Sequence, residues 1–204
     1  MRRIMGKIVC WALLAVLLIA PALAEWQVYV DQDGESYRGV WRSLPALDAV
    51  FLLPEGWVGN AYDTVYEGSE EAFYGASGDG SVRLIVTMFD TYSDSEYDDD
   101  YHGQTGEDFL EYVHAVFAPS GSTSLTEANG REAVLYRNDS NDPNYPVYVR
   151  VLLPDKGKRV ICFAFNCKTP DDLSDAFALA IAGSTVGREE LEALPESQGR
   201  EGTK

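Results

Sequence analysis

The residues best suited to chemistry form an acidic run with interspersed tyrosines between Asp90 and Asp108. Clustered carboxylates are ligands that Ca²⁺ prefers, but this spacing lacks the glycine and the distal bidentate glutamate of an EF-hand loop. Such runs are typical of solvated surface. The run therefore predicts at most weak Ca²⁺ ligands, and its tyrosines predict a binding surface. The Ca²⁺ candidates are Asp94, Glu96, Asp98, Asp99 and Asp100, and the tyrosines are Tyr92, Tyr97 and Tyr101.

Spacings that carry catalysis are missing from the sequence. His102 and His114 stand in no His-x-x-x-His or His-Glu-x-x-His pattern. There is no Gly-x-Ser-x-Gly nucleophile elbow either. We expect a non-catalytic protein without a cofactor. Two alternatives stay open: a Ca²⁺-dependent module, and a secreted hydrolase that uses carboxylate pairs on cell-wall glycans, because an acidic chain contains many such pairs.

The first 24 residues have the pattern of a secretory signal peptide. Basic residues precede an apolar run from Ile8 to Ile19, and Pro21 and the small residues Ala22 and Ala24 follow. We expect cleavage after Ala24 and a secreted or extracytoplasmic protein. The apolar run is too short for a good membrane span. We therefore expect no stable membrane insertion after cleavage.

Charge narrows the class of partner. The chain has 33 acidic and 16 Lys or Arg residues and a net charge of −17, and loss of the three basic residues of the leader brings it to −20. Such a chain repels phosphate backbones and anionic membranes, so nucleic acid is not an expected partner. We expect a protein or a cell-envelope component that binds the acidic, tyrosine-bearing surface.

Two cysteines, Cys162 and Cys167, follow the leader. Five residues of strand span about 16 Å, whereas the Cα atoms of a disulfide lie within about 7 Å. Because residues 163–166 have the pattern of a strand, the spacing predicts two unpaired thiols.

Alternating apolar and polar residues around turn sequences predict four β-hairpins. Several strands are apolar on both faces, for example at 160–165, and must be covered on both sides. A further apolar strand at 49–53 ends at Pro54-Glu55-Gly56. The hairpins are expected at 26–41, 71–90, 124–138 and 145–166, with turns at Asp33-Gly34, Gly78-Asp79-Gly80, Asn129-Gly130 and Pro154-Asp155-Lys156-Gly157.

Two segments have helical periodicity. The first begins at the capping pair Thr105 and Asp108 and ends at Pro119. The second begins at Thr169 with Pro170 in its first turn and stops at Gly183. The expected buried stripes are Phe109, Val113, Val116 and Phe117 in the first, and Leu173, Phe177, Ala180 and Ile181 in the second. The pattern predicts an α+β fold with an antiparallel β-sheet sandwiched by helices.

The order of these elements resembles the PsbP-like superfamily, which includes an extrinsic subunit of photosystem II and exported bacterial proteins of unknown role. The resemblance covers about residues 47–186 and depends on Leu53-Pro54-Glu55-Gly56-Trp57, Asn129-Gly130-Arg131-Glu132-Ala133 and Thr169-Pro170-Asp171-Asp172. It implies an α/β/α sandwich. It implies little about function, because members use one scaffold for unrelated tasks. The remaining segments are the leader (1–24), an extra N-terminal hairpin (25–46) and a polar C-terminal tail (187–204).

Overall fold

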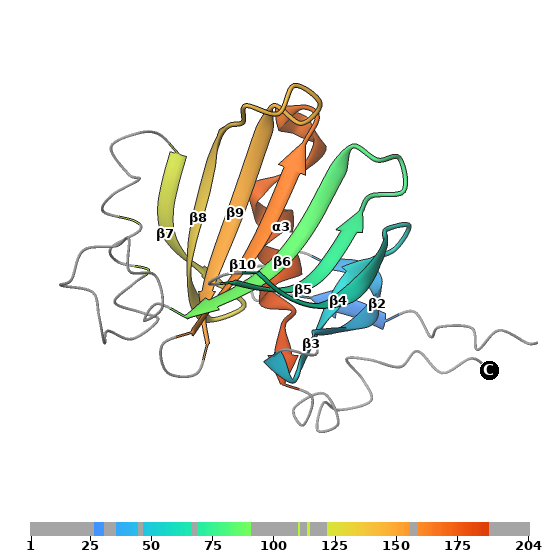
Figure 1. Cartoon of the computed structure of the whole chain (residues 1–204), viewed down its shortest axis with the longest axis vertical. Coiled ribbons are helices and arrows are strands. Elements are labelled where there is room, and N and C mark those ends of the chain that lie inside the picture. Colours follow the sequence, from blue (N-terminus) through green and yellow to red (C-terminus); the bar gives the residue numbers. More distant parts are fainter. Residues whose placement is uncertain are drawn as a thin grey trace, which may run out of the picture.

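The computed structural model describes residues 27–30, 36–44, 47–66, 69–90, 110, 114, 122–155 and 159–187. These residues form two antiparallel sheets and a helix that packs against the larger sheet (Figure 1). The larger sheet has seven strands in the order β4-β5-β6-β10-β9-β8-β7, and the smaller has four in the order β1-β2-β3-β11. In this part of the chain, no helix is long and apolar enough to cross a membrane.

The elements have the following bounds. The strands are β1 (Gln27–Val30), β2 (Ser36–Leu44), β3 (Ala49–Pro54), β4 (Val58–Tyr66), β5 (Ser69–Ala76), β6 (Val82–Asp90), β7 (Ser122–Ala128), β8 (Arg131–Asp139), β9 (Val147–Pro154), β10 (Arg159–Cys167) and β11 (Val186–Gly187). A 3₁₀ turn, η4, spans Pro170–Asp172, and the helix α3 spans Asp175–Gly183.

All four predicted hairpins are confirmed, because β1 pairs with β2, β5 with β6, β7 with β8 and β9 with β10, each antiparallel. The sharpest turn lies between β7 and β8. Asn129 and Gly130 there have φ values of 52° and 72°, the left-handed pair that a two-residue hairpin turn of type I′ requires. The strand β4 was not predicted.

The core confirms that the strands are apolar on both faces. The inner face of the larger sheet is the one that packs against β3 and α3. There, Phe51 of β3 contacts Phe73 of β5 and Phe163 of β10 edge to face, with ring centroids 5.0 and 5.6 Å apart. A separate cluster on the outer face includes Leu152, Val160 and Leu110. Leu110 lies in the first predicted helix and is fully buried. The cap and stripe residues predicted for that helix lie outside the described residues.

The prediction of an α+β fold with an antiparallel sheet is confirmed, but helices alone do not cover that sheet. The smaller sheet shares the inner face with α3 (Figure 1). The apolar strand predicted at 49–53 belongs to this smaller sheet, where it pairs with β2 and β11. The N-terminal hairpin is thereby hydrogen-bonded to the rest of the fold through β2.

The second predicted helix is divided, which corrects the expected start, whereas the predicted stop at Gly183 is confirmed. Thr169 N donates to Asp172 Oδ2 at 2.6 Å in η4, and Leu173 is extended. Ser174 then caps α3 by accepting from the Phe177 N–H at 3.1 Å. Gly183 is the last residue of α3, and the residue after it is right-handed. A glycine is needed there because a Cβ would lie 3.0 Å from the Ala128 carbonyl carbon on the β7–β8 turn.

Candidate functional site

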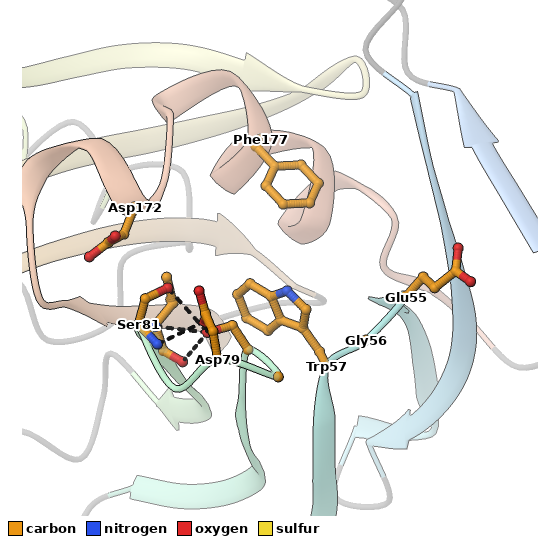
Figure 2. A pocket seen from close by; sticks show the side chains of 10 residues that line it. Glu55, Gly56, Trp57, Asp79, Ser81, Asp172 and Phe177 are labelled. Atoms are coloured by element: carbon orange, nitrogen blue, oxygen red, sulfur yellow. Dashed lines mark hydrogen bonds between the residues drawn. The ribbon is translucent and has the colours of Figure 1, made fainter.

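A pocket of about 320 Å³ lies where three turns meet at one end of the sheets. Glu55 and Trp57 come from the turn between β3 and β4, Asp79 from the turn between β5 and β6, and Asp172 and Phe177 from η4 and α3 (Figure 2). We call these five residues the acid-aromatic pocket. The first two turns lie together because β4 pairs with β5 along its length.

Two aromatic side chains form the apolar wall of the acid-aromatic pocket. Trp57 and Phe177 are both half-buried and pack against the inner core. The Phe177 ring meets Tyr37 of β2 edge to face, with centroids 5.3 Å apart. Tyr37 Oη in turn donates to the Leu52 carbonyl at 2.8 Å. The wall is therefore braced by the smaller sheet.

The Asp79 carboxylate is held in place by its own turn. Ser77 Oγ donates to Asp79 Oδ1 at 2.6 Å, and the Ser81 N–H donates to the same oxygen at 2.9 Å. Ser77 Oγ also accepts from the Val82 N–H at 3.0 Å, which fixes the direction of the hydroxyl. The Ser77 hydroxyl first, and then the donors of Ser81, lower the pKa of Asp79 to about 2. Asp79 is therefore a fixed anion at neutral pH.

Close backbone packing joins the two turns that carry Trp57 and Asp79. A Cβ on Gly78 would lie 2.5 Å from the Gly56 carbonyl oxygen. Only glycine permits this approach. The distance between the indole and the carboxylate thus depends on the backbone of both turns.

The other two carboxylates lie on either side of the aromatic wall. Figure 2 shows the Trp57 ring beneath Phe177, with Asp79 on one side of it and Glu55 on the other. Asp172 lies beyond Asp79, and its Oδ2 is oriented by the bond from Thr169 N. A ring face beside fixed anions is a favourable environment for an organic cation, because the ring quadrupole and the carboxylates both attract positive charge.

Lys168 shows that the chain already places an ammonium group near this turn. Its Nζ lies 3.9 Å from the position that a Cβ on Gly80 would take. The backbone holds Lys168 there, because its N–H donates to the Ser81 carbonyl at 3.0 Å. The ammonium group therefore lies near Gly80, and Lys168 does not line the acid-aromatic pocket.

A second cavity of about 600 Å³ lies between β11 of the smaller sheet and β8 to β10 of the larger. Its charged groups are engaged in the fold. Arg131 donates to the carbonyls of Thr185 and Pro154 at 3.3 and 2.8 Å. Arg159 Nη2 lies 2.6 Å from Asp155 Oδ2 in an ion pair. This cavity therefore offers a ligand less uncommitted charge than the acid-aromatic pocket.

None of the site residues predicted from the sequence is among the described residues. The five Ca²⁺ candidates between Asp94 and Asp100, and Tyr92, Tyr97 and Tyr101, lie outside the described residues and stay predictions. Within those residues, no three Asp, Glu, His or Cys side chains gather closely enough to hold a metal ion.

Cys162 and Cys167 are unpaired and buried, as the strand spacing predicted. They point to opposite faces of β10, one into each core cluster. Burial raises the pKa of the Cys162 thiol, and it raises that of Cys167 to about 11.

The sequence analysis missed the acid-aromatic pocket. It assigned Trp57 to a strand end, Asp79 to a turn and Phe177 to a buried helical stripe. The available signal was a pair of turns, Glu55-Gly56 and Asp79-Gly80, each with an acidic residue before a glycine. Without β4, nothing indicated that these turns share one end of the fold.

Comparisons with known proteins are limited to structure. No family model and no curated protein matches the sequence. The chain is similar to cyanobacterial PsbP from Synechocystis sp. PCC 6803, with 17% identity over 82% of this chain and 95% of that one and a TM-score of 0.42. A crystal structure from Bacteroides thetaiotaomicron VPI-5482 is similar at 16% identity and a TM-score of 0.44, over 72% of this chain but only 47% of that one. PsbP thus stands among the structural neighbours, as the resemblance predicted. At these scores, neither likeness bears on what the chain binds.

Proposed function

We propose that this protein is an exported, non-catalytic domain that binds a basic protein or envelope component, and that the acid-aromatic pocket receives a cationic side chain of the partner. The observation that carries the proposal is the fixed, ionised carboxylate of Asp79 beside the Trp57 indole. A lysine or arginine side chain fits both features. Its alkyl stem packs on the rings while its charged end meets the carboxylate.

Long-range charge supports the same class of partner. A net charge of −17, or −20 without the leader, attracts basic molecules and raises their association rate at low salt. The acidic run with Tyr92, Tyr97 and Tyr101 is proposed as a further part of the binding surface. Export is proposed on the pattern of the first 24 residues.

The direction of the Asp79 pKa excludes this carboxyl group from the acid role in glycoside hydrolysis. A hydrolase of that class needs one carboxyl group whose pKa is raised, so that it is protonated and can act as an acid. Hydrogen bonds from Ser77 and Ser81 shift the pKa of Asp79 in the opposite direction, to about 2. A permanently ionised carboxylate is suited to holding a cation.

Calorimetric titration with a short oligolysine peptide tests the proposal. We expect binding that weakens with added salt, and a loss of about fivefold in affinity on Asp79→Asn or Trp57→Leu, because each removes one interaction of about 1 kcal/mol.

Glu127→Gln is the matched control, because Glu127 is an exposed carboxylate on β7 that does not line the pocket. It removes the same charge as Asp79→Asn. If both variants weaken oligolysine equally, the attraction is diffuse and the pocket has no part in it. Melting temperatures of each variant distinguish lost binding from lost folding.

A further inference from the structure

One half of the outer face of the seven-stranded sheet carries arginine, tyrosine and asparagine side chains. The strand register places Tyr148 of β9 between Asn138 of β8 and Asn166 of β10, and places Arg83 of β6 opposite Asn166. Arg150 lies two residues further along β9, opposite Tyr136 of β8. We call this set the arginine-tyrosine face: Arg83, Tyr136, Asn138, Tyr148, Arg150 and Asn166.

The side chains of the arginine-tyrosine face contact one another across three strands. Asn138 Nδ2 donates to Tyr148 Oη at 3.3 Å, and the Tyr136 and Tyr148 rings meet edge to face. The Arg150 guanidinium lies over the Tyr148 ring, 4.7 Å from its centroid, and donates to Asn166 Oδ1 at 3.3 Å. The face is therefore ordered before any ligand arrives, which lowers the entropy cost of binding.

Arg150 has no carboxylate partner within the described part of the chain. Its Nη1 donates to the carbonyls of Val149 and Phe165 at 3.1 and 3.0 Å, and its Nη2 to the amide of Asn166. These acceptors hold the guanidinium but leave its positive charge uncompensated. In a chain with 33 acidic residues, this guanidinium is held, among the described residues, by neutral acceptors alone.

Among the described residues, the outward positions of β4 and β5 beside this half of the face carry no acidic side chain. The outward positions on neighbouring strands are Val58 and Asn60 on β4, and Tyr74 and Ala76 on β5. Arg83 forms an ion pair with Asp142 of the β8–β9 loop, with 3.8 Å between Nη1 and Oδ2. The Arg83 guanidinium also lies over the Tyr145 ring, 4.0 Å from its centroid. Asp142 therefore partly compensates the charge of Arg83, whereas Arg150 contacts only neutral acceptors among the described residues. An anion here is attracted chiefly by Arg150, because more distant surface charges are screened at physiological salt.

We propose that the arginine-tyrosine face binds an acidic polysaccharide, a glycan chain with uronic-acid carboxylates. The strands from β8 to β6 span about 14 Å at 4.8 Å each, enough for a chain of several sugars. Tyrosine rings pack on the C–H faces of sugars, and asparagine amides donate and accept hydrogen bonds with hydroxyl groups. A guanidinium recognises a carboxylate through two parallel hydrogen bonds.

A protein ligand fits this face less well. Protein interfaces gain most of their affinity from anchors buried in pockets. The two cavities described above are lined by other residues. A partly buried row of ring and amide groups that lines no pocket is better matched to a flat, repetitive polymer.

Affinity electrophoresis of the purified protein in gels with polygalacturonate tests the inference, with dextran as the neutral polymer and polyglutamate as the acidic peptide. We expect retardation by polygalacturonate alone. Arg83→Gln and Arg150→Gln should each weaken it about tenfold, because each removes one charge-assisted contact.

Arg38→Gln on β2 is the matched control, because it removes one exposed positive charge elsewhere. Asp79→Asn should leave retardation unchanged, which separates this face from the acid-aromatic pocket. Arg83 is half-exposed, so Arg83→Gln carries the test if Arg150→Gln lowers the melting temperature. The proposal is overturned if polygalacturonate does not retard the protein, or if Arg38→Gln weakens retardation as much as the two face variants do. Equal retardation by polyglutamate would also overturn it and would indicate that the ligand is an acidic protein.

Discussion

Replacing Arg137 with alanine should destabilise the segment that leads into α3. Arg137 of β8 donates through Nη2 to the Leu173 carbonyl at 2.6 Å and through Nη1 to the Pro170 carbonyl at 3.1 Å. Its Nε and Nη2 also reach Asp175 Oδ1, at 3.0 and 2.7 Å. One side chain therefore joins the large sheet to η4 and to the first turn of α3.

The size of the effect follows from the kinds of bond lost. Two hydrogen bonds from a charged donor to carbonyls contribute about 1–1.5 kcal/mol each. The ion pair with Asp175 contributes about 0.5 kcal/mol, because the Asp175 side chain is 50% exposed. We expect Arg137→Ala to lower the free energy of unfolding by about 3 kcal/mol, and the melting temperature by about 6–12 °C.

Asp175→Asn separates the two contributions. It removes the ion pair and a favourable charge at the start of α3, together about 1 kcal/mol, and leaves the carbonyl bonds intact. Urea unfolding followed by circular dichroism measures both variants. If Asp175→Asn costs as much as Arg137→Ala, or if Arg137→Ala costs less than about 1 kcal/mol, the carbonyl bonds do not hold this segment.

Three further outcomes are expected. Burial raises the pKa of Cys167 to about 11 and raises the pKa of Cys162 as well. Neither thiol should therefore react with an alkylating reagent at about pH 8 until denaturant is added. Rapid labelling of the folded protein would contradict the buried positions of the two thiols. The lowered pKa of Asp79 means that its carboxylate stabilises the fold above about pH 4 and that this stabilisation is lost as the pH falls to about 2. The melting temperature of the wild type should therefore fall more over that pH interval than the melting temperature of Asp79→Asn. Parallel curves for the two proteins would show that the turn does not stabilise the anion. The intact mass of the protein purified from its host should match a chain that begins at Glu25. A mass that includes residues 1–24 would refute the predicted cleavage.

Local sequence was sufficient for the hairpins and for the two-sided strands. The Asn129-Gly130 turn depends on backbone preferences of those two residues. The alternation in β10 is likewise contained within the strand, since Ile161, Phe163 and Phe165 all enter the inner core cluster. The strand pattern of residues 163–166 also predicted that the two cysteines are too far apart for a disulfide, and they are unpaired.

The strand β4 could not be found in this way. Val58 is 65% exposed, and Gly59 and Asn60 interrupt any apolar alternation. Its place comes from hydrogen bonds to β5, with a register shift between Ala61 and Thr64. An edge strand with little buried surface leaves a weak pattern in the sequence.

The division of the second predicted helix also required distant residues. Leu173 is buried in the inner core, and its carbonyl is taken by Arg137 from another strand. An extended Leu173 satisfies both contacts, and Ser174 then restarts the helix. Propensity alone predicted a continuous helix from Pro170, because Pro170, Asp171 and Asp172 all favour a first turn.

By itself, the sequence determined the signal-peptide pattern, the excess of acidic residues, the turns and the apolar strand faces. Each of these depends on composition or on neighbouring residues. Only the tertiary structure decided that Trp57, Asp79 and Phe177 line one pocket, because β4–β5 pairing joins the first two turns and the packing of α3 on the core adds Phe177. It also decided that Arg150 lies without a carboxylate partner in the described part of an acidic chain. The pairing of β6 with β10 joins strands far apart in sequence and brings Arg83 beside Asn166, and no local preference of the chain encodes that pairing.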